Sequence, residues 1–236
     1  MFRLRKRSIF GKGYLDLPRV EVLRDKKQYV DSGLKLQEIK LNGHHDIQKN
    51  WDLLLSIESA VAFGKQARIL DAGSGSKAIF AKSMANLGLK KVYACDFQKA
   101  EIKGVVSSIQ DISQTNYNDD FFDFIACHSV IEHGVDLSEF LKEMFRITRS
   151  GGALAISTDF WPREEDHSDK FPYGLAQPPM KLFNNKSFAD FLALATSIGW
   201  DVPRYEDIEE FTPRPVVWPR MNCEYTFIWA LLNKPT

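Results

Sequence analysis

The stretch ARILDAGSGS, residues 67–76, decides the fold of this chain. A short apolar run leads into two glycines, which is how a buried strand enters a tight turn. From Lys77 to Leu87 the apolar residues recur at helical spacing, and Gly88 stands where such a helix would end. A strand, a glycine turn and a helix in this order predict the first unit of an open α/β sheet.

The same alternation continues along the chain. Further strands are predicted over residues 90–96, 105–111, 121–129, 151–158 and 225–233, with a weaker one over 202–208. Helices are predicted over 47–63, before the first strand, and over 137–148 and 187–198. These elements predict a doubly wound sheet of seven strands with helices on both faces.

The bulk composition fits one such domain. The chain has 236 residues, 44% of them hydrophobic, which is enough to bury a substantial core. We expect one domain over residues 47–236, with residues 1–46 as an N-terminal extension or cap. The 31 basic and 31 acidic residues balance, which argues against a nucleic-acid partner held by broad phosphate neutralisation. The basic cluster over residues 3–8 is interpreted as a solvated tail, with contact to a phosphate or an anionic membrane surface as the alternative.

Membrane, targeting and metal signals are weak. No apolar run has the length of a signal peptide or of a membrane span, so a cytoplasmic protein is expected. The three cysteines are scattered without a CxxC pair, and neither the histidine spacing nor the nearby carboxylates form a convincing ligand set. We therefore expect no disulfide and no metal site.

The glycine turn is the predicted ligand anchor, because ligands of open parallel sheets bind beyond the carboxyl ends of the strands. Gly73 and Gly75, with Ser74 between them, allow an adenosyl ligand to lie against the main chain. Asp71 directly precedes them. A carboxylate there suits a cationic amine, such as that of a methionine moiety, better than a pyrophosphate, which it would repel.

Two more acids follow the next two predicted strands. Asp96 stands about where an acid binds ribose hydroxyls in dinucleotide-binding units, and Phe97 beside it offers an apolar face to an adenine. Asp111 can accept from the exocyclic amine of adenine while Ile112 covers the ring. Each acid alone could equally cap a helix. Their succession at three strand ends favours a ligand site.

These motifs resemble those of class I S-adenosylmethionine-dependent methyltransferases, nearest the broad group of ubiquinone- and menaquinone-type enzymes. The resemblance rests on DAGSGS, the acid in YACDFQ, IQDIS and the segment over residues 122–158, and it covers roughly residues 68–158. It implies a Rossmann-like, mostly parallel sheet whose last strand is antiparallel, and S-adenosyl-L-methionine as the cofactor. Ser76 departs from the pattern, because the family usually has a third glycine there. By this resemblance the methionine part is lined by Asp71, Gly73 and Gly75, the ribose by Asp96, the adenine by Asp111 and Ile112, and the pocket beyond the fourth strand by His128.

The acceptor side is less defined. Methyl transfer from a sulfonium needs mainly positioning, and a base only where the acceptor must lose a proton. His128, His133 and Asp159 are the candidate bases, with packing or capping as their alternative roles, and His167 is a weaker candidate. Residues 159–184 are predicted to form a lid, whose aromatic residues Phe160, Trp161, Phe171 and Tyr173 suit an apolar or ring-shaped acceptor. His44 and His45, before the first predicted helix, are candidates to close over the cofactor, with ordinary loop histidines as the alternative.

Three functions remain open on this sequence. The first is methyl transfer to an oxygen or nitrogen of a small molecule, such as a sugar or another biosynthetic precursor. The second is a non-catalytic scaffold that binds S-adenosylmethionine on the same fold. An NAD-dependent oxidoreductase is disfavoured, because the turn lacks the third glycine and Asp71 would face a pyrophosphate.

Overall fold

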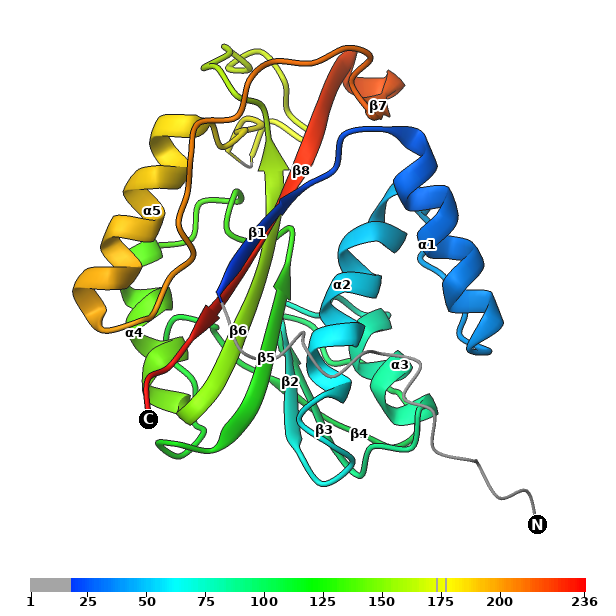
Figure 1. Cartoon of the computed structure of the whole chain (residues 1–236), viewed down its shortest axis with the longest axis vertical. Coiled ribbons are helices and arrows are strands. Elements are labelled where there is room, and N and C mark those ends of the chain that lie inside the picture. Colours follow the sequence, from blue (N-terminus) through cyan, green and yellow to red (C-terminus); the bar gives the residue numbers. More distant parts are fainter. Residues whose placement is uncertain (1–17, 173, 177) are drawn as a thin grey trace.

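A mixed, mostly parallel sheet runs through the centre of the molecule (Figure 1). The computed structural model describes residues 18–236 except 173 and 177. The strands are β1 (Arg19–Val22), β2 (Arg68–Ala72), β3 (Lys91–Asp96), β4 (Val105–Ile109), β5 (Phe122–His128), β6 (Thr148–Phe160), β7 (Val216–Trp218) and β8 (Cys223–Asn233). Their order is β1-β8-β6-β5-β2-β3-β4, with β7 pairing with β8 off this path. Strands β2 to β6 are parallel to one another and β8 is antiparallel to β6, which confirms the predicted sheet and its last strand.

Helices cover both faces of the sheet, as predicted. One face carries α1 (Lys26–Glu38), the short helix η1 (Ile47–Lys49), α2 (Asn50–Val61) and α3 (Ile79–Asn86), and the other carries α4 (Leu137–Ile147) and α5 (Asn185–Ile198) (Figure 1). A second short helix, η2 (Pro219–Met221), joins β7 to β8. The side chains of Asp25, Asp136 and Asn184 cap the first turns of α1, α4 and α5.

The predicted weak strand over residues 202–208 is wrong, because this segment forms no strand. Its backbone bonds instead to the start of α5: Asn185 accepts from the Ile208 amide at 3.0 Å and from the Tyr205 hydroxyl at 2.6 Å. The seventh strand of the main path is β1, which pairs with β8 in antiparallel register from Arg19 opposite Leu231 to Val22 opposite Ile228. Residues 19–46 therefore contribute an edge strand and a helix, while the proposed boundary at residue 46 stays a prediction.

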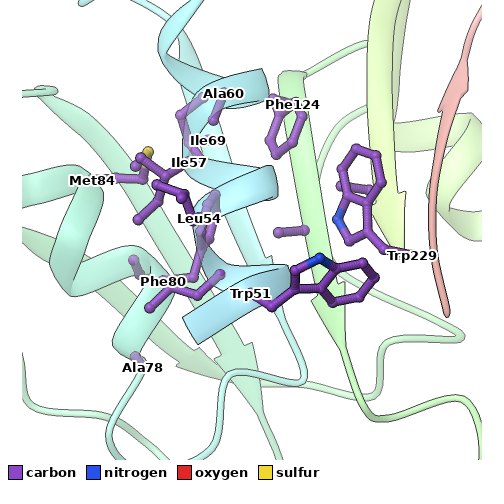
Figure 2. Close-up of a cluster of buried hydrophobic side chains, with 14 of the residues drawn as sticks. Trp51, Leu54, Ile57, Ala60, Ile69, Ala78, Phe80, Met84, Phe124 and Trp229 are labelled. Atoms are coloured by element: carbon purple, nitrogen blue, oxygen red, sulfur yellow. The ribbon is translucent and has the colours of Figure 1, made fainter. Parts of the chain in front are cut away.

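The core on the α2 face is built from large apolar side chains on helices and strands (Figure 2). Trp51, Leu54 and Ile57 of α2 pack in one buried cluster with Phe124 of β5 and Trp229 of β8. The indole of Trp229 is fully buried and donates from Nε1 to the Ser56 hydroxyl at 2.8 Å. This hydrogen bond ties the middle of α2 to the sheet.

The basic cluster over residues 3–8 lies outside the described residues. Within the described part of the chain, no helix has both the length and the apolar character needed to cross a membrane. All three cysteines, Cys95, Cys127 and Cys223, are free and buried.

Candidate functional site

A cavity of about 660 Å³ opens at the carboxyl ends of β2, β5 and β6. This is the edge of the sheet where the ligand was predicted. The cavity joins the glycine turn to the opposite wall formed by η1, β7 and β8. Of the predicted residues, those that line it are Asp71, Gly73, Ser74, Gly75, His128, His133 and Asp159, together with His44 and His45.

The glycine turn is hydrogen-bonded to the end of β3. The amides of Gly73 and Ser74 donate to the Cys95 carbonyl at 2.9 and 3.2 Å, and the Gly75 amide donates to Asp96 Oδ2 at 2.9 Å. Both glycines have positive φ, +71° and +61°. A Cβ on Gly73 would lie 2.5 Å from Val130 Cγ2, whereas a Cβ on Gly75 would meet no atom within 4 Å. Gly73 is therefore required by packing, and Gly75 leaves open space beside the main chain.

Asp71 is buried beneath this turn. Its Oδ2 accepts from the Ala81 amide in the first turn of α3 at 3.0 Å, so the capping role weighed for this acid is present. Burial raises the pKa of Asp71 to about 7, and the negative charge of Asp96 adds to this rise. A cationic group in the cavity would favour the ionised carboxylate, which suits the ammonium of a methionine moiety.

The residues predicted to hold the adenosine lie beside the cavity rather than in its wall. Asp96 also accepts from the Gln98 amide at 3.2 Å, and Asp111 accepts from the Ser113 amide at 2.8 Å. Phe97 is 74% exposed and Ile112 is buried. Over residues 97–121 the structure describes no helix for these acids to cap, so both instead accept from backbone amides of the turns that follow their strands, and their roles toward a ribose and an adenine stay predictions.

His128, the last residue of β5, is bonded to α2. Its Nε2 lies 2.6 Å from the Ser56 hydroxyl, which also accepts from Trp229. Burial lowers the pKa of His128, so the ring is neutral near pH 7. A neutral, hydrogen-bonded imidazole suits a wall of the cavity, and its role as a base stays a prediction.

His167 lies away from the cavity. It is buried, with Nε2 3.3 Å from Cys223 Sγ and Nδ1 3.2 Å from the Glu165 carbonyl. These contacts place His167 inside the packing of the 159–184 segment, and its role as a base stays a prediction. His133, in contrast, is exposed at the cavity.

Sequence reasoning missed several charged residues of the cavity wall, among them Glu132 and Lys49. Glu132 lies beside the candidate His133 and accepts from the Thr158 hydroxyl at 2.9 Å through Oε2. Lys49 ends η1, with its Nζ 4.2 Å from the ring centre of Phe227 and bonded to the Ser129 hydroxyl. The signal for Glu132 was its position one residue before His133, whereas Lys49 lies far away in sequence and only the packing of η1 brings it in.

Asp159 lies on β6, one residue before the strand ends, and is 6% exposed. The pKa of Asp159 is raised to about 7, mainly by burial and also by the charge of Glu132, while the charge of Lys49 opposes this rise. The pKa of Glu132 is also raised by burial. Two buried carboxyls and one ammonium thus meet at the end of β6.

The predicted lid is only partly a surface loop. Phe160 and Trp161 were expected to cover an acceptor, but both are buried, and Trp161 packs against Arg214 and Phe211. Further along, Pro172, Pro178 and Met180 join Asp159 and His133 around a second cavity of about 40 Å³. Tyr173 lies outside the described residues. The lid function of this segment stays a prediction.

His44, His45 and Asp46 bring one possible metal-ligand atom each within 4.8 Å of one another at the cavity wall. His44 Nδ1 already accepts from the Asp46 amide at 3.0 Å, and the two imidazoles stack. Burial lowers the pKa of His44 to about 4. These contacts account for the local geometry.

The raised pKa values predict how stability varies with pH. An unfolded Asp ionises near pH 4, whereas Asp71 and Asp159 hold their protons in the folded state up to about pH 7. The unfolded state therefore loses protons first, and the free energy of unfolding should fall as pH rises from about 4 to 7 and then level off.

In Asp159→Asn one of these contributions is absent. The difference in unfolding free energy between the variant and the parent chain, each measured at the same pH, should therefore rise in favour of the variant by on the order of 1–3 kcal/mol from pH 4 to pH 8. Urea unfolding at both pH values measures this gain. A difference between variant and parent that does not change with pH would contradict the assignment.

Known proteins share parts of this sequence pattern and this fold. A family model described as a methyltransferase domain matches residues 70–156. No curated protein matches the chain. The solved structures to which the chain is similar include three whose TM-scores of 0.53–0.60, at 14–15% identity, show a shared fold.

The first is from the complex between the Haloferax volcanii Trm112 methyltransferase activator and a methyltransferase (15% identity, TM-score 0.58, 91% of this chain and 100% of that chain). The second is Haemonchus contortus phosphoethanolamine N-methyltransferase 2 in complex with S-adenosyl-L-methionine (14%, 0.53, 75% and 51%). The third is the [4+2]-cyclase SpnF (15%, 0.60, 84% and 86%).

Proposed function

We propose that this chain is a class I S-adenosylmethionine-dependent methyltransferase that transfers a methyl group to an oxygen or nitrogen of a small-molecule acceptor, such as a sugar or another biosynthetic precursor; the methyltransferase-domain match over residues 70–156 supports this. One observation carries the proposal. A single cavity connects the glycine turn after β2 with the polar cluster at the ends of β5 and β6. A cofactor and an acceptor can therefore meet in it.

The residues present fit S-adenosylmethionine. The main chain of Gly73, Ser74 and Gly75, with its open space at Gly75, would hold the methionine part beside Asp71. The adenosine part would lie toward the ends of β3 and β4, where the exposed ring of Phe97 and the buried Ile112 flank Asp96 and Asp111. When bound, the cofactor supplies a methyl group activated by a sulfonium. The narrower likeness to quinone-type enzymes stays a prediction.

The acceptor would occupy the other end of the cavity. Asp159 and His133 lie there, within reach of the small cavity beneath the 159–184 segment. His128 is held by Ser56 and would orient the wall between the two ligands. With a pKa of about 7, Asp159 can hold or release a proton near neutral pH.

Asp96→Ala is expected to weaken S-adenosylmethionine binding by about 1–3 kcal/mol, the size of a lost hydrogen bond to a charged group. The variant loses the proposed ribose contact and also the bond from the Gly75 amide that fixes the turn. Isothermal titration calorimetry measures the affinity, with Glu101→Ala, an exposed acid in the loop between β3 and β4, as the control. Affinity equal to that of the parent chain would mean that the ribose lies elsewhere.

Two experiments test the function itself. Calorimetric titrations with S-adenosylmethionine and with NAD should give saturable binding of the first only, and the opposite result would overturn the proposal. Transfer of a labelled methyl group into a metabolite extract then tests turnover. Persistent silence across diverse extracts, with the cofactor bound, would favour the scaffold alternative.

A further inference from the structure

Two buried carboxyls at the acceptor end of the cavity are incompletely satisfied. Glu132 is 4% exposed and Asp159 is 6% exposed, and both residues line the cavity. Within the described part of the chain, Glu132 Oε1 and Asp159 Oδ1 have no hydrogen-bond partner. The Glu132 carboxyl otherwise accepts from the Thr158 hydroxyl and from the backbone amides of Glu132 and Asp159, and the Asp159 carboxyl accepts from the Tyr225 hydroxyl. Buried carboxylate oxygens without donors are costly, which indicates that a ligand supplies them.

The charges around Asp159 balance only while one of the two carboxyls keeps its proton. The groups that act on it are Glu132, Lys49, His133 and Tyr225, and Cys223 on β8 is also near enough to interact. Partial desolvation in the cavity lowers the pKa of His133, and burial raises that of Cys223 to about 11, so both are neutral near pH 7. Lys49 is then the one cation among these groups, against two carboxyls. Ionisation of both acids leaves one negative charge in excess.

We infer that the acceptor presents a protonated amine, which Asp159 binds with the help of Glu132, and that Asp159 takes the proton that this amine must lose. The inference rests on the proposed function and narrows its acceptor to a nitrogen compound. One ammonium supplies both the missing positive charge and donors for the two free oxygens. A hydroxyl acceptor supplies a single donor and leaves the excess charge in place.

The proposed step is balanced. The ammonium nitrogen gives one proton to the Asp159 carboxylate, and its freed electron pair forms the new bond to the methyl carbon. The bond from that carbon to sulfur breaks, and its electron pair stays on the sulfur. The product is a methylated ammonium ion and a neutral thioether, and the proton on Asp159 leaves to solvent. An Asp with a pKa near 7 can exchange this proton at neutral pH.

The test uses a matched pair of probes, 2-phenylethylamine and 2-phenylethanol, which differ in the amine. Each is titrated into the full chain saturated with S-adenosylhomocysteine, which has no sulfonium charge, by calorimetry between pH 6 and pH 8.5. At pH 8 the amine should bind about 10- to 100-fold more tightly than the alcohol, as expected for a hydrogen bond between charged groups. Below about pH 7 this preference should fall, because amine binding must then displace a proton from Asp159.

Variants separate the binding role from folding. Asp159→Asn should lose the preference for the amine and the associated proton release. Glu132→Gln should still bind the amine more tightly than the alcohol. The pH at which half of this preference is lost should be lower than in the parent chain, because the Glu132 charge that raises the pKa of Asp159 is gone. Asp166→Asn, an exposed acid on the 159–184 segment, is the matched control and should behave like the parent chain. If Asp159→Asn does not fold, the shift in Glu132→Gln carries the test.

The outcomes distinguish this inference from the proposed function. Equal binding of the two probes, binding of neither, or an unchanged preference in Asp159→Asn would overturn the amine assignment while S-adenosylmethionine still binds. The inference would also be overturned if Glu132→Gln lost half of its preference for the amine at the same pH as the parent chain. Failure to bind S-adenosylmethionine at all would instead overturn the proposed function.

Discussion

Replacing Trp229 with alanine is expected to lower the free energy of unfolding by about 3–5 kcal/mol, the usual cost of emptying a large buried aromatic site. The indole is fully buried among side chains of α2 and β5 (Figure 2). It also lies 5.1 Å from the Arg19 guanidinium of β1. The substitution therefore loosens α2, the centre of the sheet and the β1 edge together. Urea unfolding followed by circular dichroism measures the loss.

Trp229→Phe is the control for this prediction. Phenylalanine keeps most of the apolar volume but cannot donate to Ser56, so the expected loss is smaller, about 1–2 kcal/mol. The same variant leaves the Ser56 hydroxyl to His128 alone. If the alanine variant were as stable as the phenylalanine variant, the packing around the indole would contribute less than its burial indicates.

Gly73→Ala is expected to cost about 2–4 kcal/mol, from left-handed backbone strain and overpacking together. The added Cβ would come within 2.5 Å of Val130 Cγ2, and Val130 lies in the loop that carries Glu132. Relief of the clash must move the glycine turn or this loop. S-adenosylmethionine affinity should therefore fall with stability, which calorimetry and urea unfolding measure on the same variant.

Gly75→Ala is the matched control. It has a similar φ of +61° but open space around the added carbon, so only the backbone strain of about 1–2 kcal/mol is expected in the free protein. Equal losses of stability in the two variants would contradict the packing role of Gly73. A Gly75→Ala chain that is stable but binds the cofactor poorly would place the ligand against this main chain.

Local patterns were enough to predict the strands and helices of the central domain. The runs before and after the glycine turn are apolar at the period of their own element, so β2, β3, β5 and β8 could be read without tertiary information. The segment over 202–208 failed for a physical reason. Its apolar residues look like a short strand, but Asn185 offers its backbone better partners than a sheet edge.

The site was predictable only where residues are close in sequence. Asp71 and the glycines follow one strand, and Asp159 lies at the end of another, so topology alone brings them to one edge. Lys49 and Tyr225 reach the cavity through the packing of η1 and the pairing of β8, which no local pattern encodes. The burial that raises the pKa of Asp159 is likewise a property of the assembled fold.

The pairing of β1 with β8 has a consequence for how the protein folds during synthesis. Leu23, directly after β1, bonds to Thr226 across 203 residues of chain. During synthesis, β1 leaves the ribosome first and stays unpaired until β8 has been made. Tyr225 and Phe227 of the cavity wall lie on that same late strand. We expect the β2–β6 sheet to form first, and the acceptor end of the cavity to be completed last, in a slow step set by this long loop closure.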